Sequence, residues 1–216
     1  MFKGFRFVET CQDIKFKQEY ACRVDVFTGC ITFPDNFCQF TESNTELIQK
    51  VFPNVAQNHR AHIWLSERAI LAAKNVDVNE LNFKIQNEIA GELRTYKSVD
   101  SATNQDDVNY PPEFLNSLVL PGLPPHNLQL KVGSGKYKGE DVLIPRIPMI
   151  PTDIPFEFKR LQFQVRLAFA MTINKSQGQS LSVCGINLEN PCFSFGQLYV
   201  ACSRVGKLSA LFVYAP

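Results

Sequence analysis

Residues 165–180 constrain the fold of this chain more than any other stretch. The first half, 165–171, is an almost unbroken apolar run. Such a run is typical of a strand that is buried on both faces of a parallel sheet. The second half, 172–179, is polar and crowds hydroxyls, amides, one cation and one glycine together. A buried strand that ends in such a loop brings these groups to the carboxyl edge of the sheet, where open α/β sheets bind ligands.

The polar loop has two interpretations. In the first, it is an ordinary turn from strand to helix, in which Asn174 or Ser176 caps the next helix. In the second, Lys175 lies among small donors and Gly178 lets the backbone approach a ligand closely, which favours an anion site. The density of polar groups favours the anion site.

Three segments resemble motifs of the Pif-type DNA helicases, a superfamily-one group that includes the helicases of Helitron transposons. The segment Thr172-Ile-Asn-Lys-Ser-Gln-Gly-Gln179 is similar to the fifth motif of this family. The segment Phe195-Gly-Gln-Leu-Tyr-Val-Ala-Cys-Ser-Arg-Val205 resembles the sixth motif, and the strand–Asn75–helix unit resembles the fourth. The resemblance is strong over 145–216, fair over 31–130 and weak before that. Gln164 and Phe195 depart from the family pattern, which usually has proline and histidine at these positions.

The resemblance implies a role for each of these segments. Arg204 would be the arginine finger that reaches the terminal phosphate of the nucleotide, although a surface arginine near a helix C-terminus is the alternative reading. Gln177 and Gly178 would lie near the phosphates of the nucleotide. The remaining candidates would contact single-stranded DNA: Asn75, Thr172, Asn174, Lys175 and Ser176. Family members use ATP and Mg²⁺, act in DNA repair and recombination, and are found in the nucleus or mitochondrion.

The chain has no complete phosphate-binding loop of its own. Gly133-Ser-Gly-Lys136 invites that reading, but Leu130 stands where the first glycine of G-x-x-x-x-G-K-[ST] belongs. Tyr137 stands where the magnesium-binding hydroxyl belongs. The sequence also lacks an apolar run followed by Asp-Glu that could hold magnesium. We therefore expect no tight binding of ATP or Mg²⁺ to this chain by itself.

Alternation of strands and helices over 165–216 predicts an α/β fold with a RecA-like parallel sheet, that is, the second helicase domain. The predicted strands are 68–73, 165–171, 181–188 and 208–214, and a capped helix is predicted over 41–52. We expect a poorly defined segment 1–64 and a RecA-like domain 65–216. Compared with the family, this domain would have a shortened insertion around 121–155 and no Walker-bearing first domain.

Charge and cysteine content limit the other possibilities. The net charge of +1 gives no global field for nucleic acid, so binding must use a local patch. The seven cysteines include no C-x-x-C pair. A zinc site from Cys22, Cys30, Cys38, His59 and His62 is conceivable, but unpaired thiols fit better. With no secretory signal and no membrane-length apolar window, we expect an intracellular protein.

Two functional hypotheses follow. The first is the C-terminal portion of an ATP-dependent 5′–3′ DNA helicase of the Pif/Helitron type, inactive by itself, which binds single-stranded DNA weakly and works with a helicase domain that this chain lacks. The second is a non-catalytic module that binds single-stranded nucleic acid or a protein. A blander alternative is a pseudogene-like product that retains no activity.

Overall fold

This computed structural model describes residues 23–24, 31–32, 37–102, 110–120, 122–132, 143–151, 154–194 and 196–216. The chain divides into two compact units: unit 1 is Met1–Ile89 with Ala168–Pro216, and unit 2 is Ala90–Leu167. The predicted boundaries, at residue 64 and around 121–155, stay a prediction. A strand from before residue 64 pairs within the main sheet of unit 1, and unit 2 includes strands from before residue 121.

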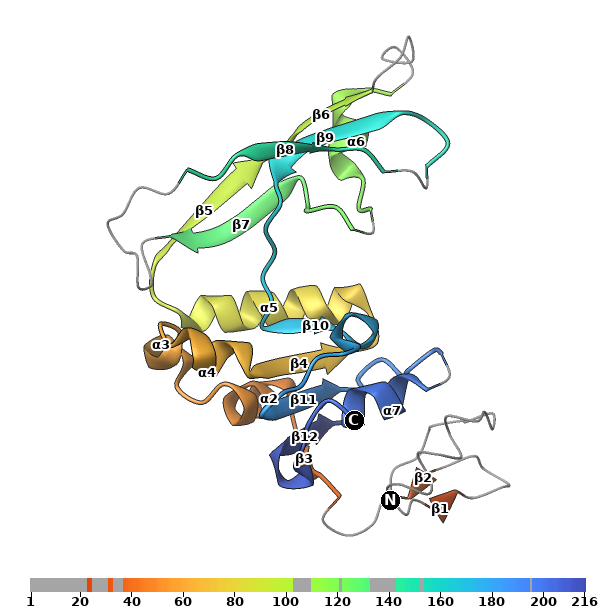
Figure 1. Ribbon diagram of the computed structural model, residues 1–216. Helices are drawn as coiled ribbons and strands as arrows, with labels where there is room; N and C mark the ends of the chain where they lie inside the picture. Colours follow the sequence, from red (N-terminus) through yellow and green to blue (C-terminus); the bar gives the residue numbers. More distant parts are fainter. Residues whose placement is uncertain are drawn as a thin grey trace. The chain divides into compact units, whose positions relative to one another are not determined.

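Unit 1 consists of one main sheet, the helices that pack against it and a separate pair of two-residue strands (Figure 1). In chain order they are β1 (Arg23–Val24), β2 (Ile31–Thr32), β3 (Gln39–Thr41), α2 (Asn44–Val51), α3 (Val55–Asn58), α4 (His62–Ser66), β4 (Arg68–Ala72), α5 (Asn75–Glu88), β10 (Ala170–Thr172), the 3₁₀ turn η2 (Ile173–Ser176), β11 (Val183–Asn187), α7 (Gln197–Cys202), the 3₁₀ turn η3 (Leu208–Ala210) and β12 (Leu211–Tyr214).

The main sheet has five strands in the order β10-β4-β11-β12-β3, and every neighbouring pair is parallel. The predicted α/β class with a parallel sheet is thereby confirmed. β4 lies between β10 and β11, as a strand near the middle of the sheet. Because all strands are parallel, their carboxyl ends meet at one edge.

The strand expected over 165–171 requires a correction. β10 comprises Ala170–Thr172 alone, and it lies at the edge of the sheet, not buried within it. Residues 165–167 belong to unit 2 and lead into unit 1, so this apolar run is largely a connection. The predicted strands 181–188 and 208–214 are also shorter in the structure, as β11 and β12.

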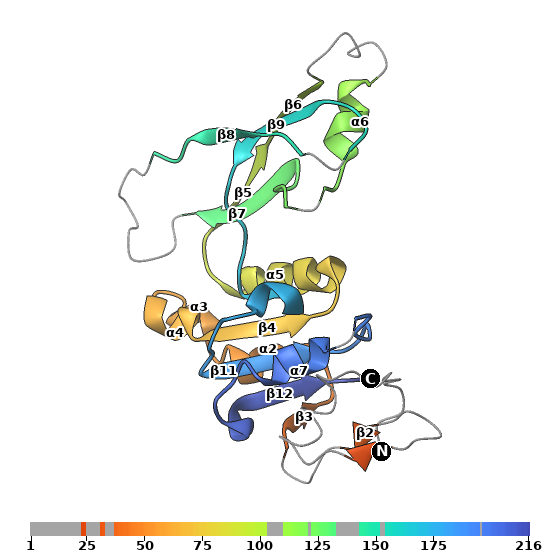
Figure 2. The ribbon, with the colours of Figure 1, turned by 45° about the vertical axis from the view of Figure 1, so that its right-hand side comes forward.

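Helices cover both faces of this sheet, and β4 shows how its side chains alternate between them. Ile70 and Ala72 pack in a buried cluster with residues of α2 and α5. Ala69 and Leu71 pack on the other face with residues of α7, which lies over β11 and β12 (Figure 2). This alternation gives three layers, with both faces of the central strands buried.

Two local features hold the helices in place. The predicted helix over 41–52 is present as α2, and the hydroxyl of Ser43 caps it by accepting a hydrogen bond from the backbone N–H of Glu46 at 3.1 Å. α2 also packs very close to β11: a Cβ atom added at Gly185 would lie 2.7 Å from Cγ2 of Val51. Glycine is therefore needed at position 185 for helix and strand to approach this closely.

The free side of the edge strand β10 is closed by a side chain of α5. The amide of Asn82 donates to the carbonyl of Ala170 at 2.9 Å and accepts from its N–H at 2.9 Å. These two bonds satisfy backbone groups that a neighbouring strand would otherwise take. The sheet therefore ends at β10.

Unit 2 is built from antiparallel strands and one short helix (Figure 1). Its elements are β5 (Glu92–Lys97), β6 (Val99–Ala102), α6 (Pro112–Ser117), β7 (Asn127–Val132), β8 (Arg146–Met149) and β9 (Phe158–Phe163). β5 pairs with β7, and β9 lies between β6 and β8. The helix α6 begins directly after Pro111.

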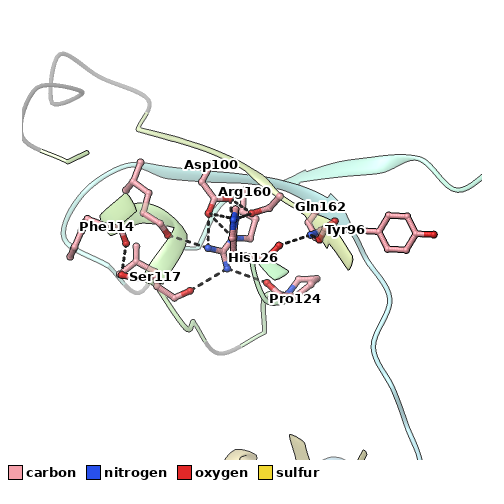
Figure 3. A network of polar contacts seen from close by, with 11 residues as sticks. Tyr96, Asp100, Phe114, Ser117, Pro124, His126, Arg160 and Gln162 are labelled. Atoms are coloured by element: carbon pink, nitrogen blue, oxygen red, sulfur yellow. Dashed lines mark hydrogen bonds and ion pairs between the residues drawn. The ribbon is translucent and has the colours of Figure 1, made fainter. Parts of the chain in front are cut away.

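A buried ion pair lies at the centre of unit 2 (Figure 3). The side chains of Arg160 and Asp100 are both 0% exposed and approach to 2.7 Å. Arg160 also donates to the carbonyls of Leu115, Leu118 and Pro124, so that all five N–H groups of its guanidinium have acceptors. This one side chain therefore connects β9 to β6, to the C-terminal end of α6 and to the segment before β7.

Candidate functional site

The polar loop after β10 lies at the carboxyl edge of the sheet, as predicted. Thr172, at the end of β10, is half-buried, whereas Asn174 and Lys175 are exposed on the single turn η2. Gly178 has a φ of 82°, a left-handed conformation that other residues adopt only with strain, and Gln177 beside it is exposed. The loop thus presents amide and ammonium donors to solvent and turns back sharply at its glycine.

The inner side of this loop is anchored in the core. Ile173 is fully buried, and the fully buried Ser176 donates its hydroxyl to the carbonyl of Ile173 at 2.7 Å. Ser176 was expected to contact DNA, but its hydroxyl points into the loop and its side chain is not on the surface. The geometry therefore assigns Ser176 to holding the loop in shape.

Arg204 contacts the same loop from the end of α7. Its guanidinium donates to the carbonyls of Ser176 at 3.4 Å and Gln179 at 3.1 Å. It also donates to the carbonyl of Val200 at 2.9 Å and to the hydroxyl of Ser203 at 2.8 Å. The side chain is half-buried. Arg204 and the loop that carries Lys175 are therefore neighbours in the fold, although they come from different motifs in the sequence.

The first residue of α7 makes a second link to this loop. The buried side chain of Gln197 donates from Nε2 to Oδ1 of Asn174 at 3.2 Å. Its Oε1 accepts a hydrogen bond from the backbone N–H of Phe193 at 3.2 Å. Sequence reasoning did not single out Gln197, although a glutamine beside Leu198 on an apolar helix face is a signal that could have found it.

Asn75 is exposed as the first residue of α5, directly after β4. Thr172 lies in register with Ala72, so Asn75 and the polar loop project from the same edge of the sheet. The structure records no hydrogen bond between Asn75 and the loop among the described residues. The fold therefore brings Asn75 to the edge of the sheet that carries the loop, but not into the polar network of the loop.

A further polar chain at this edge was not predicted. Lys74 donates to Oδ1 of Asn190 at 2.8 Å, and Nδ2 of Asn190 donates to Oδ1 of Asp77 at 2.8 Å. Burial raises the pKa of Asp77, and the hydrogen bond from Asn190 partly opposes this effect. The polar chain ties the start of α5 to the segment after β11. Polar residues directly after two neighbouring strands are the sequence signal for such a contact.

Two cysteines of the described residues, Cys184 and Cys192, are free thiols. Cys184 and Cys202 lie in the core. Burial raises the pKa of Cys184 to about 12 and that of Cys192 to about 11, so neither is a thiolate near neutral pH.

Other expectations concern metal and membrane sites. The residues that the structure describes contain no group of three or more His, Cys, Asp or Glu side chains able to hold a metal ion. Cys22, Cys30, Phe195 and the segment 133–142 lie outside the described residues. No helix in the described ranges is both long enough and apolar enough to cross a membrane.

Sequence comparison finds no matching family model. Three curated proteins are similar to parts of the chain. The ATP-dependent DNA helicase PIF6 of Trypanosoma brucei brucei is 34% identical over 79 residues, which are 36% of this chain and 10% of that protein. Pif1 of Campylobacter jejuni is 46% identical over 56 residues, which are 25% of this chain and 12% of that protein. The ATP-dependent DNA helicase RRM3 of Saccharomyces cerevisiae is 36% identical over 83 residues, which are 37% of this chain and 11% of that protein.

Structural comparison supports the same relationship at the level of the fold. The crystal structure of Pif1 helicase from Candida albicans matches with a TM-score of 0.56 and 20% sequence identity. The match covers 86% of this chain and 50% of that one, so the chain spans about half the length of the solved structure. The curated matches each cover about a tenth of the relative's length. The chain, an α/β protein with a RecA-like parallel sheet, is therefore similar to part of a Pif1-type DNA helicase.

Proposed function

We propose that this chain is the C-terminal portion of an ATP-dependent 5′–3′ DNA helicase of the Pif/Helitron type, acting in the nucleus or mitochondrion. In this role the loop of Thr172, Asn174 and Lys175 contacts the phosphates of single-stranded DNA. Asn75 adds a donor from the same edge of the sheet. Arg204, Gln177 and Gly178 face a nucleotide whose phosphates and Mg²⁺ are held by a Walker-bearing domain.

The observation that carries the proposal is that the loop exposes its donors while the residues beside them are buried. Asn174 and Lys175 are exposed donors, while Ile173 and Ser176 on either side of them are fully buried. A loop fixed in this way keeps its donors in one arrangement, so little conformational entropy is lost when a phosphate binds. Phosphate oxygens accept hydrogen bonds and attract the ammonium group, which together favour a nucleic-acid backbone as ligand.

Arg204 supports the nucleotide half of the proposal. Its guanidinium holds the loop through the carbonyls of Ser176 and Gln179. A nucleotide phosphate that drew the guanidinium toward itself would break these bonds and release the loop that faces the DNA. This shared contact gives the chain a physical route between the nucleotide and the DNA. When bound, ATP with Mg²⁺ would supply the phosphoryl group that is transferred to water.

Measurement of single-stranded DNA binding tests the proposal. We expect weak, salt-sensitive binding of an oligothymidylate, measured by fluorescence anisotropy at several salt concentrations. Lys175→Ala should weaken binding and lower the salt slope by about 1, because one phosphate contact is lost. Lys50→Ala is the matched control, since Lys50 is an exposed lysine in the last turn of α2 in the same unit. Equal affinity and salt slope for native chain and Lys175→Ala would refute the DNA-binding role of the loop.

ATP turnover separates the two functional hypotheses. We expect the purified chain to release no phosphate from ATP, with or without single-stranded DNA, because it lacks a Walker motif. Mixing with a Walker-bearing helicase domain should give DNA-stimulated turnover that Arg204→Ala abolishes. Turnover that does not depend on Arg204 would contradict the finger role. DNA binding without any effect on the added domain would favour the non-catalytic binding module.

A further inference from the structure

The buried side chain of Gln197 has a fixed orientation. A backbone N–H can only donate a hydrogen bond, so the atom of Gln197 that faces the N–H of Phe193 must be its oxygen. The Nε2 group then faces Asn174, 23 positions earlier in the chain. Gln197 is 4% exposed, so water does not compete freely for either contact.

This orientation determines which end of Asn174 points outward. Because Nε2 of Gln197 is a donor, Asn174 must direct its Oδ1 toward Gln197 as the acceptor. Nδ2 of Asn174 then lies on the other side of the same planar amide. Among the described residues, no protein acceptor is recorded for this Nδ2, and Asn174 is exposed. The two N–H groups of Asn174 are therefore left for solvent or a ligand.

We propose that Gln197 is a positioning residue that sets the polarity of Asn174, so that the loop presents donors, not an acceptor, to a phosphate. A phosphate oxygen cannot donate, so an amide rotated by half a turn would place oxygen against oxygen. The rotated form would also set Nδ2 of Asn174 against Nε2 of Gln197. This proposal rests on the proposed phosphate contact of the loop, and it assigns to Gln197 a role that acts through Asn174.

Gln197→Glu tests the proposal with little change in shape. A carboxylate at this position still accepts from the N–H of Phe193, but it offers an acceptor to Asn174 in place of a donor. Asn174 should then turn its Nδ2 inward and its oxygen outward. We expect affinity for oligothymidylate to fall about tenfold, the size expected for one lost hydrogen bond to a charged group. Because the carboxylate also adds negative charge, the variant needs a matched control.

Gln179→Glu supplies this control. Gln179 is exposed in the same loop, and the contact recorded for its side chain goes to the carbonyl of Lys175, not to Asn174. Gln179→Glu therefore adds the same charge without reversing the side-chain amide of Asn174. Affinity should fall clearly less than in Gln197→Glu. In an Asn174→Ala background the difference between the two variants should disappear, because the side chain through which Gln197 acts is absent.

The outcomes distinguish this proposal from the proposed function. If Lys175→Ala weakens binding but Gln197→Glu behaves like Gln179→Glu, the role of Gln197 is overturned and DNA binding stands. If Lys175→Ala has no effect, the proposed function fails. The native chain gives a second measurement if Gln197→Glu does not fold. The side-chain NH₂ resonances of Asn174 should shift as oligothymidylate is added, and resonances that stay unchanged would overturn the proposal.

Discussion

Replacing Asp100 with asparagine should strongly destabilise unit 2. Asp100 is the sole carboxylate recorded against the fully buried guanidinium of Arg160 in the described residues, and it accepts from Nε and Nη2 at 2.7 to 3.2 Å. The Asp100→Asn variant keeps the shape of the side chain but leaves the charge of Arg160 uncompensated. Breaking a buried pair in this way costs about 3–5 kcal/mol. We expect the lower end, because the asparagine oxygen can still accept one bond.

The assay must distinguish unit 2 from unit 1. Hydrogen exchange of the β9 amides reports on unit 2, whereas fluorescence of Trp64, the single tryptophan of the chain, reports on unit 1. Glu92→Gln is the matched control, because it removes an exposed ion pair with Arg94 from the same unit. Such an exposed pair contributes little to stability, because water and salt screen its charges.

Asp100→Asn should speed exchange in β9 far more than Glu92→Gln does, with little change at Trp64. The exchange rate of the β9 amides in Arg160→Lys should lie between the rates of these two variants, since lysine keeps the charge but has only three donors. If Asp100→Asn has no larger effect than Glu92→Gln, the pair does not stabilise unit 2 in the way described.

Two further predictions concern unit 1. Gly185→Ala should lower the free energy of unfolding by about 1–3 kcal/mol, because the added Cβ would lie 2.7 Å from Cγ2 of Val51. In urea unfolding the loss should be smaller in a Val51→Ala background, and an equal loss would contradict the proposed clash. The pKa of Asp77 is raised in the folded chain. As pH rises above the unfolded pKa of about 3.9, the unfolded chain therefore releases a proton that the folded chain still keeps. The contribution of Asp77 to the free energy of unfolding falls over this range. Asp77→Asn should therefore gain stability relative to the native chain between pH 4 and 7 in thermal unfolding, and a constant difference across that range would refute this linkage.

Local signals in the sequence predicted α2, the capped helix expected over 41–52. The hydroxyl of Ser43 caps its first turn, and the proline after Phe52 ends it. The alternation of strand and helix after residue 180 likewise gave the parallel sheet. These elements depend on residues a few positions apart, which is the range over which sequence patterns are informative.

The remaining features depend on partners that are distant in the sequence. The apolar run 165–171 does not reveal that its first residues belong to unit 2. It also does not reveal that β10 is the last strand of the sheet, because this depends on pairing with β4 and on the hydrogen bonds of Asn82. The ion pair of Arg160 joins residues 60 positions apart. In the candidate site, the motif resemblance singled out Lys175 and Arg204 separately, and the fold brings them to the same loop. The resemblance did not predict that Ser176 points inward.

The position of β3 has a consequence for how the chain folds during synthesis. β3 pairs with β12, and Thr41 bonds to the carbonyl of Val213, 172 positions later in the chain. A ribosome therefore releases β3 well before its partner exists, and the whole of unit 2 is made in between. A strand that waits so long with free backbone groups is exposed to wrong pairing and aggregation. β3 has three residues, and Gln39 and Phe40 are exposed even in the finished sheet. Its shortness leaves few backbone groups to pair with another chain before β12 emerges.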